Sequence, residues 1–228
     1  MKNIEIFWIS DIHSCLNELK VALIKAGYNA NGNDHKLLFL GDAFDKGHQH
    51  YETYLFLKNN IENNKLIWVI GNHDLFLLHS LAINKASRFT NDTIKDIAKG
   101  LDCNCNEAEY IKVLKDNGVD KFIINNTLNY YETNNYVFTH GTIPFNTDNT
   151  YDANWRNRNN KEWYRYINTG YKKLVDNNIK IPNKTLVCGH QFCGEKNKSA
   201  LPYYTEGIIA IDGNCYKTGV MNVIVIED

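Results

Sequence analysis

The chain lacks the features that mark several classes of protein. Only three of its 228 residues are proline and 43% are hydrophobic, which argues against a disordered or fibrous chain and favours a packed globular one. No apolar run approaches the roughly 18 residues that a membrane-spanning helix needs. Its 25 Lys and Arg residues are balanced by 26 Asp and Glu residues, so no overall basic field attracts nucleic acids. We therefore expect neither a membrane nor a nucleic-acid partner.

The chain has no closely paired cysteines, and we expect no secretory leader at its amino terminus. Its six cysteines form no C-x-x-C motif, so we expect buried thiols rather than disulfides or a zinc site. Glu5 and Asp11 fall where a signal peptide requires an uninterrupted apolar run. We expect a cytoplasmic protein, and the sequence does not reveal its oligomeric state.

One pattern recurs along the chain: a short apolar run that ends in glycine or a polar residue. Such runs predict buried strands that each deliver a loop. The five runs are Ile4–Ile9, Lys36–Leu40, Lys65–Ile70, Tyr136–Thr139 and Thr185–Cys188.

The segments between these runs predict helices packed on a sheet. Residues 15–27 place Leu and Ile on one helical face before a glycine, and 51–59 and 74–81 resemble further helices. The alternation indicates an α/β fold with a largely parallel sheet in the first 85 residues. We expect a single domain over residues 1–228, with a helical insertion or cap around 84–129. The tail, 207–228, predicts a terminal hairpin.

Metal-ligand residues follow these predicted strands. In open α/β sheets, ligands bind beyond the carboxyl ends of the strands, where loops gather side chains from several strands. Carboxylate, imidazole and amide oxygen suit manganese, iron or zinc, and one carboxylate can bridge two ions. A lone His or Asp is usually structural, but five successive strand ends carrying such residues predict a site. The residues are Asp11, His13, Asp42, Asn72, His73, His140 and His190.

The motifs that hold these residues resemble a known set. They read Asp11-Ile12-His13, then GDAFDKG (41–47), GNHD (71–74), His140-Gly141 and Gly189-His190. Their order and spacing resemble the calcineurin-like metallophosphoesterase superfamily. Within it they are most similar to the phosphoprotein phosphatase family, particularly bacterial and phage serine/threonine phosphatases and symmetric dinucleoside tetraphosphatases. The resemblance implies a central β-sandwich of mixed sheets flanked by helices, with a dinuclear metal site at the strand–helix loops.

The resemblance also implies roles for individual residues. Asp11, His13 and Asp42 would hold one divalent ion. The second ion would be held by Asp42, Asn72, His140 and His190, with Asp42 as the bridge. The expected ions are two Mn, with Fe or Zn as alternatives, and a metal-bridging hydroxide would attack without a covalent phosphoenzyme. His73 would be the general acid, oriented by Asp45, although a supporting role behind the ligands stays open for His73.

Phosphate recognition calls for cations near the metals. The segment NWRNR (154–158) supplies Arg156 and Arg158, of which either can instead be a solvated surface charge. Lys46 stands where the family usually has arginine, which replaces a bidentate donor with a point charge, so it either contacts phosphate or points to solvent. Ser10 and Ser14 flank the first motif where the family usually has glycine, which alters the loop and leaves the ligands intact.

Together these residues predict the metal-dependent hydrolysis of a phosphate ester. The main reading is a serine/threonine protein phosphatase-like phosphomonoesterase acting on a phosphoprotein or a small phosphate ester. The alternative is a symmetric bis(5'-nucleosyl)-tetraphosphatase, and an alternative of another class is a catalytically silent binding module on the same fold. The insertion at 84–129 is expected to decide between these substrates, because it can either exclude a folded protein or shape a nucleotide pocket.

Overall fold

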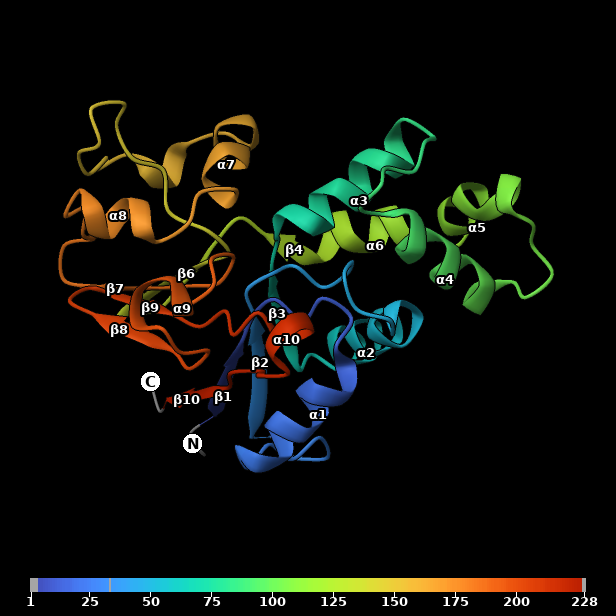
Figure 1. Cartoon of the computed structure of the whole chain (residues 1–228), viewed down its shortest axis with the longest axis horizontal. Coiled ribbons are helices and arrows are strands. Elements are labelled where there is room, and N and C mark those ends of the chain that lie inside the picture. The colour runs from blue at the N-terminus through green and yellow to red at the C-terminus, as the bar shows by residue number, and fades with distance from the viewer. Residues whose placement is uncertain (1–3, 33, 227–228) are drawn as a thin grey trace.

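Two five-stranded mixed sheets form the centre of the molecule (Figure 1). The computed structural model describes residues 4–32 and 34–226. The first sheet has the strand order β10-β1-β2-β3-β4, and the second has β5-β6-β7-β9-β8. The first sheet contains β1 (Glu5–Ile9), β2 (His35–Phe39), β3 (Leu66–Val69), β4 (Thr127–Leu128) and β10 (Ile224–Ile226). The second contains β5 (Tyr131–Glu132), β6 (Tyr136–Thr139), β7 (Thr185–Cys188), β8 (Tyr203–Thr205) and β9 (Ile208–Ala210).

The predicted strands are confirmed, but they are divided between two sheets. β1, β2 and β3 are parallel neighbours, with Phe7 opposite Leu37 and Phe39 opposite Trp68. β6 and β7 are parallel neighbours in the second sheet. Carboxyl ends from both sheets therefore supply the loops that carry the motif residues.

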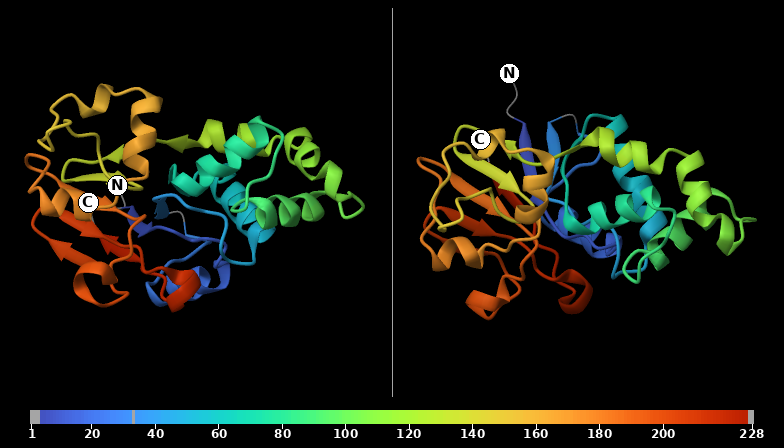
Figure 2. Two further views of the ribbon diagram at one scale, coloured as in Figure 1. Left: turned by 45° about the horizontal axis from the view of Figure 1, so that its top comes forward. Right: turned by 90° about the horizontal axis from the view of Figure 1, so that it is seen from above.

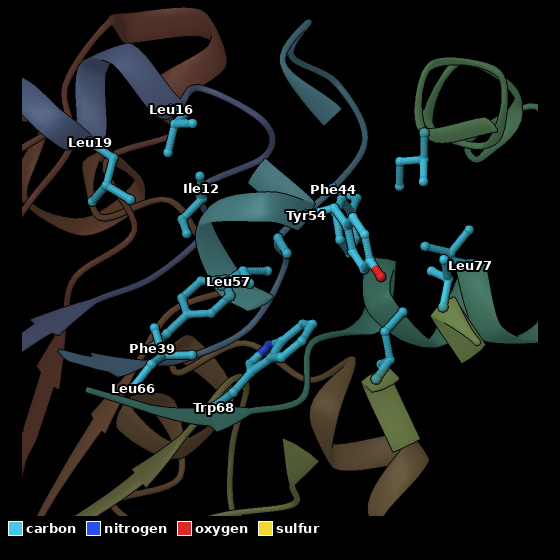
Figure 3. Packing of buried hydrophobic residues seen from close by; sticks show 14 of the residues in the cluster. Ile12, Leu16, Leu19, Phe39, Phe44, Tyr54, Leu57, Leu66, Trp68 and Leu77 are labelled. Carbon is cyan, nitrogen blue, oxygen red and sulfur yellow. The ribbon is translucent and has the colours of Figure 1, made fainter. Parts of the chain in front are cut away.

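The strands alternate their side chains between two apolar layers, as the two-residue period of a strand requires. Trp8 and Leu38 pack between the sheets with Phe138 and Val187, and Trp8 meets Phe138 edge to face at a centroid distance of 4.7 Å. Neighbouring residues on the same strands face outward into a second cluster. Figure 3 shows part of it, where Phe39, Leu57 and Trp68 come together from β2, α2 and β3. Strands buried on both faces explain the continuous apolar runs of the sequence.

Helices cover the outer faces of both sheets. Helices α1 to α6 accompany the first sheet and α7 and α8 the second, and Figure 2 shows α3 to α6 extending away from the second sheet. The helices beside the first sheet are α1 (Leu16–Lys25), α2 (His50–Glu62), α3 (Asn72–Ala82), α4 (Asn91–Leu101), α5 (Tyr110–Asp116) and α6 (Val119–Asn126). The later ones are α7 (Asn160–Ile167), α8 (Lys172–Asp176), α9 (Gly194–Asn197) and α10 (Cys215–Thr218), and the short 3-10 turns are η1 (Glu107–Glu109) and η2 (Trp155–Asn157). None of the helices within 4–32 and 34–226 combines the length and apolar character needed to cross a membrane.

The predicted terminal hairpin is wrong. β9 pairs with β7 and β8 in the second sheet, whereas β10 pairs antiparallel with β1 in the first. The segment between them contains α10 and does not turn tightly, so it carries the chain from one sheet to the other. Alternating apolar residues predict a strand and a buried face, but they do not specify the partner strand. The last two residues of that prediction, 227 and 228, lie outside the described residues.

Candidate metal centre

The loops after β1 and β2 are joined to each other by backbone hydrogen bonds. The amide of Asp11 donates to the carbonyl of Gly41, and that of His13 donates to the carbonyl of Asp42, both at 3.0 Å. Asp11, His13 and Asp42 all have positive φ angles, between 43° and 59°. Non-glycine residues rarely adopt this conformation, and when several do so together they are typical of a functional loop that the surrounding structure stabilises.

Asp42 lies at the centre of a buried His/Asp cluster. Its Oδ2 is 3.4 Å from Nε2 of His13, and its Oδ1 is 3.3 Å from Nε2 of His140. Two groups with metal-ligand geometry share this carboxylate, the first completed by His13 and His73 and the second by His140 and His190. A carboxylate common to both groups is placed as a bridge between two ions would be.

Glycine lets the chain approach this carboxylate closely. A Cβ atom at Gly71 would lie 2.3 Å from Oδ1 of Asp42 and 2.2 Å from its backbone nitrogen. A Cβ atom at Gly189 would lie 2.2 Å from Oδ2 of Asp11. Any side chain at either glycine would displace the carboxylate that it faces, which explains why the motifs contain glycine there.

The imidazoles present their Nε2 atoms to the cluster. Nδ1 of His13 is 2.8 Å from the carbonyl oxygen of Phe44, and Nδ1 of His140 is 2.6 Å from that of Leu40. A carbonyl only accepts, so each Nδ1 carries the proton and, in a neutral ring, leaves Nε2 with a lone pair. Nε2 of His140 then faces two further acceptors, Oδ1 of Asn72 at 3.0 Å and Oδ1 of Asp42. Converging acceptors without a donor between them fit a metal cation.

The charges of the cluster also favour a cation. Burial raises the pKa of Asp11 well above its usual range, and the nearby charge of Asp212 raises it further. Burial disfavours protonation of His140, but Asp42 outweighs it and raises the pKa of His140 to about 10. In the absence of metal the buried carboxylates therefore draw a proton to His140, and a bound dication would take over that role.

The imidazoles of His13 and His190 stay neutral. Burial lowers the pKa of His13 to about 3, and burial together with the neighbouring His140 lowers that of His190 to about 4. A metal ligand must be the neutral imidazole, so these residues are ready to bind near neutral pH. The amide of His190 also donates to Oδ2 of Asp11 at 2.9 Å, which ties the second sheet to the first.

His73 lies at the edge of the cluster, at the start of α3. Its Nδ1 is 2.7 Å from Oδ2 of Asp45, and its backbone amide donates to Oδ1 of Asp42 at 2.8 Å. The bond to Asp45 fixes the ring and leaves Nε2 as the atom that can exchange a proton with a bound molecule. Distance alone does not separate a ligand from a general acid, because His73 also belongs to the first group around Asp42. The role of general acid stays a prediction.

Three further residues support the site, and none of them has a role predicted from the sequence. The buried carboxylate of Asp74 accepts from the amides of Gly71, Asp42 and Ala43, at 2.9 to 3.1 Å. Thr93 donates through Oγ1 to Oδ1 of Asp45 at 2.5 Å. Asp212 is buried beside Asp11, and burial raises its pKa. Asp74 follows His73 in the motif, which was a usable signal. Nothing in the sequence joins Thr93 to residue 45.

The predicted phosphate-binding cations have different surroundings. Nζ of Lys46 lies 2.9 Å from Nε2 of His13 and 4.9 Å from the ring centre of Tyr216, so it reaches the cluster. Arg156 pairs with Glu132 at 2.5 Å, and Arg158 pairs with Asp152 at 2.7 Å and with Glu162 at 2.9 Å. Neither arginine contacts the cluster among the residues that the structure describes. Their assignment to phosphate stays a prediction and gains no support from these ion pairs.

The chain has two packed mixed sheets, and a buried His/Asp cluster lies in the loops at their strand ends. This arrangement is typical of metal-dependent hydrolases with a dinuclear metal site. The chain belongs to the calcineurin-like phosphoesterase family, whose model matches residues 4–207. The predicted family, α/β sandwich fold and hydrolase class are thereby confirmed.

Parts of the chain are similar in sequence to individual curated proteins. A symmetrical bis(5'-nucleosyl)-tetraphosphatase of Buchnera aphidicola is 34% identical over 92 residues, which cover 39% of this chain and 32% of that protein. The matched segments span about a third of the length of the curated relatives, from 29% to 43%. Among solved structures, a putative diadenosine tetraphosphatase has a TM-score of 0.56 at 14% identity and covers 99% of this chain and 94% of its own. A protein-tyrosine phosphatase of Shewanella sp. has a TM-score of 0.59 at 16% identity, covering 99% and 76%. At such identities these two structures show the fold alone.

Proposed function

We propose that this metallophosphoesterase is a symmetric dinucleoside tetraphosphatase, which hydrolyses its substrate to two nucleoside diphosphates. The observation that carries the chemistry is the hydrogen-bonded pair of His73 and Asp45 beside the buried Asp42 cluster. The substrate is supported by the curated relatives, which have this activity in their names. The sequence motifs favour a protein phosphatase instead, but the likeness to solved protein phosphatases extends to the fold only.

The residues that would hold two divalent ions are those around the shared carboxylate. They are Asp11, His13 and Asp42 for one ion, and Asp42, Asn72, His140 and His190 for the other. When bound, the ions would neutralise charge on the phosphate oxygens and activate the attacking water. Manganese is the ion that we propose, with iron or zinc as the alternatives, because imidazole and oxygen donors accept all three.

The chain's own side chains then handle the leaving group. The oxygen of water bonds to one inner phosphorus and the water releases a proton to solvent, while the bond from that phosphorus to the bridging oxygen breaks. His73 gives the proton from Nε2 to the leaving oxygen, while Asp45 holds Nδ1 and stabilises the charged ring. No serine or cysteine nucleophile takes part, so no covalent phosphoenzyme forms.

Product analysis tests the proposal. Metal-stripped protein is supplied with manganese and assayed on diadenosine tetraphosphate, a phosphoserine peptide and para-nitrophenyl phosphate. We expect manganese-dependent turnover, a preference for the dinucleotide and adenosine diphosphate as the only nucleotide product. ATP with AMP would contradict symmetric cleavage, and preference for the peptide would restore the protein phosphatase reading. Bound metal without turnover of any of the three would indicate the silent binding module.

A further inference from the structure

A pocket of about 440 Å³ adjoins His73 on the side of the cluster where α4 lies. This volume falls within the range of small-molecule sites, about 300–1,000 Å³. The loop after β2, the turn before α4 and one face of α4 surround it. Its lining includes His73, Arg88, Phe89, Asp92, Lys95 and Lys99.

Helix α4 is fixed to the site, so it forms a stable wall of this pocket. Thr93 bonds to Asp45, which in turn holds His73. One turn further along the same helix, Oδ2 of Asp96 accepts from the backbone amides of His50 and Tyr51, at 3.0 and 3.1 Å. The pocket is therefore positioned relative to the proton donor by two separate sets of hydrogen bonds.

The turn before α4 presents an arginine and an aromatic ring. It is anchored by buried Thr90, whose Oγ1 lies 2.8 Å from Oγ of Ser80 and accepts from the amide of Ser87 at 3.0 Å. Phe89 is 46% exposed, lies 6.0 Å from the ring of His73, and stacks on Phe76 at a centroid distance of 5.6 Å. Aromatic stacking on this anchored turn holds the start of α4 close to the proton donor.

Arg88 is pre-positioned and has no anionic partner within the described part of the chain. Its Cζ lies 4.7 Å from the ring centre of Phe89, which restricts the guanidinium without using its hydrogen-bond donors. Lys95 and Lys99 add cationic charge from the next turns of α4. Of the acidic groups in the lining, Asp45 and Asp96 accept hydrogen bonds from the protein itself, and Asp92 is the one that would oppose an anion.

We propose that this pocket binds the leaving nucleotide of a dinucleoside polyphosphate and that Arg88 contacts its phosphate groups. The inference rests on the proposed function and adds which part of the chain selects the substrate. Symmetric cleavage releases a nucleoside diphosphate whose terminal oxygen takes the proton of His73, so its charged phosphates lie next to that residue. The seryl oxygen of a phosphoprotein brings no such charge. An arginine fork matches phosphate oxygens with two donors at once, which a neutral leaving group does not use.

The test compares Arg88→Ala with Arg165→Ala. Arg165 is an exposed arginine that also lies over a ring, that of Tyr166 at 5.7 Å, but it lines a different pocket. The manganese-loaded proteins are compared in kcat/KM for diadenosine tetraphosphate and for para-nitrophenyl phosphate, and in the Kd for adenosine diphosphate by calorimetry. A charge-assisted contact corresponds to at least about tenfold in affinity.

We expect Arg88→Ala to lower kcat/KM for the dinucleotide at least about tenfold more than for the small ester, and to raise the Kd for adenosine diphosphate by about tenfold. Arg165→Ala is expected to match the wild type in all three measurements. Equal effects of Arg88→Ala on both substrates, with an unchanged Kd, would overturn the pocket while leaving symmetric hydrolysis intact. If the wild type does not cleave the dinucleotide, the proposed function fails, and the Kd alone decides: a tenfold rise supports the subsite and an unchanged value refutes it.

Discussion

Oγ1 of Thr93, on α4, donates to Oδ1 of Asp45, and Oδ2 of the same carboxylate lies 2.7 Å from Nδ1 of His73. Asp45 is thus held from both sides, by a residue 48 positions further along the chain and by the imidazole that it orients. This relationship makes α4 part of the structure that positions His73, the predicted proton donor. The stretch 84–129, expected from its sequence to act as a helical insertion, contributes α4 to the site, and its description as a separate insertion or cap stays a prediction.

Replacing Thr93 by valine is expected to slow turnover and reduce stability. The change keeps the shape of the side chain but removes a hydrogen bond to a buried carboxylate, which costs about 2 kcal/mol in the free energy of unfolding. Urea unfolding and kcat measure the two effects. Thr53→Val is the matched control, because Thr53 is also buried and its hydroxyl has no hydrogen-bond partner among the described residues. Equal losses in the two variants would show that the bond to Asp45 does not matter.

His73→Asn is expected to lower kcat by about 10²- to 10⁴-fold, the usual contribution of a general acid. Manganese content, measured by mass spectrometry of the purified protein, should stay close to that of the wild type. The decrease in kcat should be smaller for para-nitrophenyl phosphate, because its leaving group departs more easily without protonation. Loss of both metals in this variant would refute the general-acid role and place His73 among the ligands.

Asp42→Asn is expected to remove both ions together, because this carboxylate belongs to both groups of ligand atoms. The same metal analysis provides the measurement, and circular dichroism checks that the variant folds. Asp116→Asn serves as the control, because this carboxylate is exposed and pairs with Lys112 far from the cluster. Loss of only one ion from a folded Asp42 variant would contradict the bridging position.

The ion pairs of Glu132 predict a dependence of stability on pH. The bond from Arg156 lowers the pKa of Glu132 from 4.5 to about 2, and Lys184 also contributes. A carboxyl with a lowered pKa in the folded state stabilises the protein above its unfolded value and loses that contribution as the pH falls. At pH 7 the free energy of unfolding of the wild type should exceed that of Glu132→Gln by about 1 kcal/mol. The difference is this small because the carboxylate is partly exposed and solvent screens its ion pairs.

The difference in the free energy of unfolding between wild type and Glu132→Gln should shrink as the pH falls from 5 to 3. Urea unfolding at each pH measures it. Glu107→Gln is a suitable control, because Glu107 is exposed and forms no ion pair with a described residue. A difference between wild type and Glu132→Gln that stays constant over this range would show that the ion pairs do not hold the charge of Glu132.

Local patterns predicted much of the fold and the cluster. Each strand end is encoded by neighbours in sequence, such as Thr139 before His140, and buried strands have a recognisable apolar run. Pairing between distant segments is not encoded in this way. The sequence therefore misplaced the tail, whose β10 pairs with β1 from the other end of the chain, and it gave no signal for Thr93, which reaches Asp45 only because α4 packs beside the loop after β2. The pairing of Arg156 with Glu132 is another long-range contact that the sequence does not encode, and the assignment of Arg156 to phosphate stays a prediction.

The hydrogen bond between the amide of His190 and Asp11 joins residues 179 positions apart. During synthesis the amino-terminal strands leave the ribosome first, and they carry Asp11, His13 and Asp42 without the imidazoles of the second sheet. The complete set of predicted metal ligands exists only after about 190 residues have been made, because His190 is the last of them along the chain. A nascent chain thus cannot acquire its full catalytic capacity until its two sheets have met, and premature termination upstream of that point leaves a protein without it.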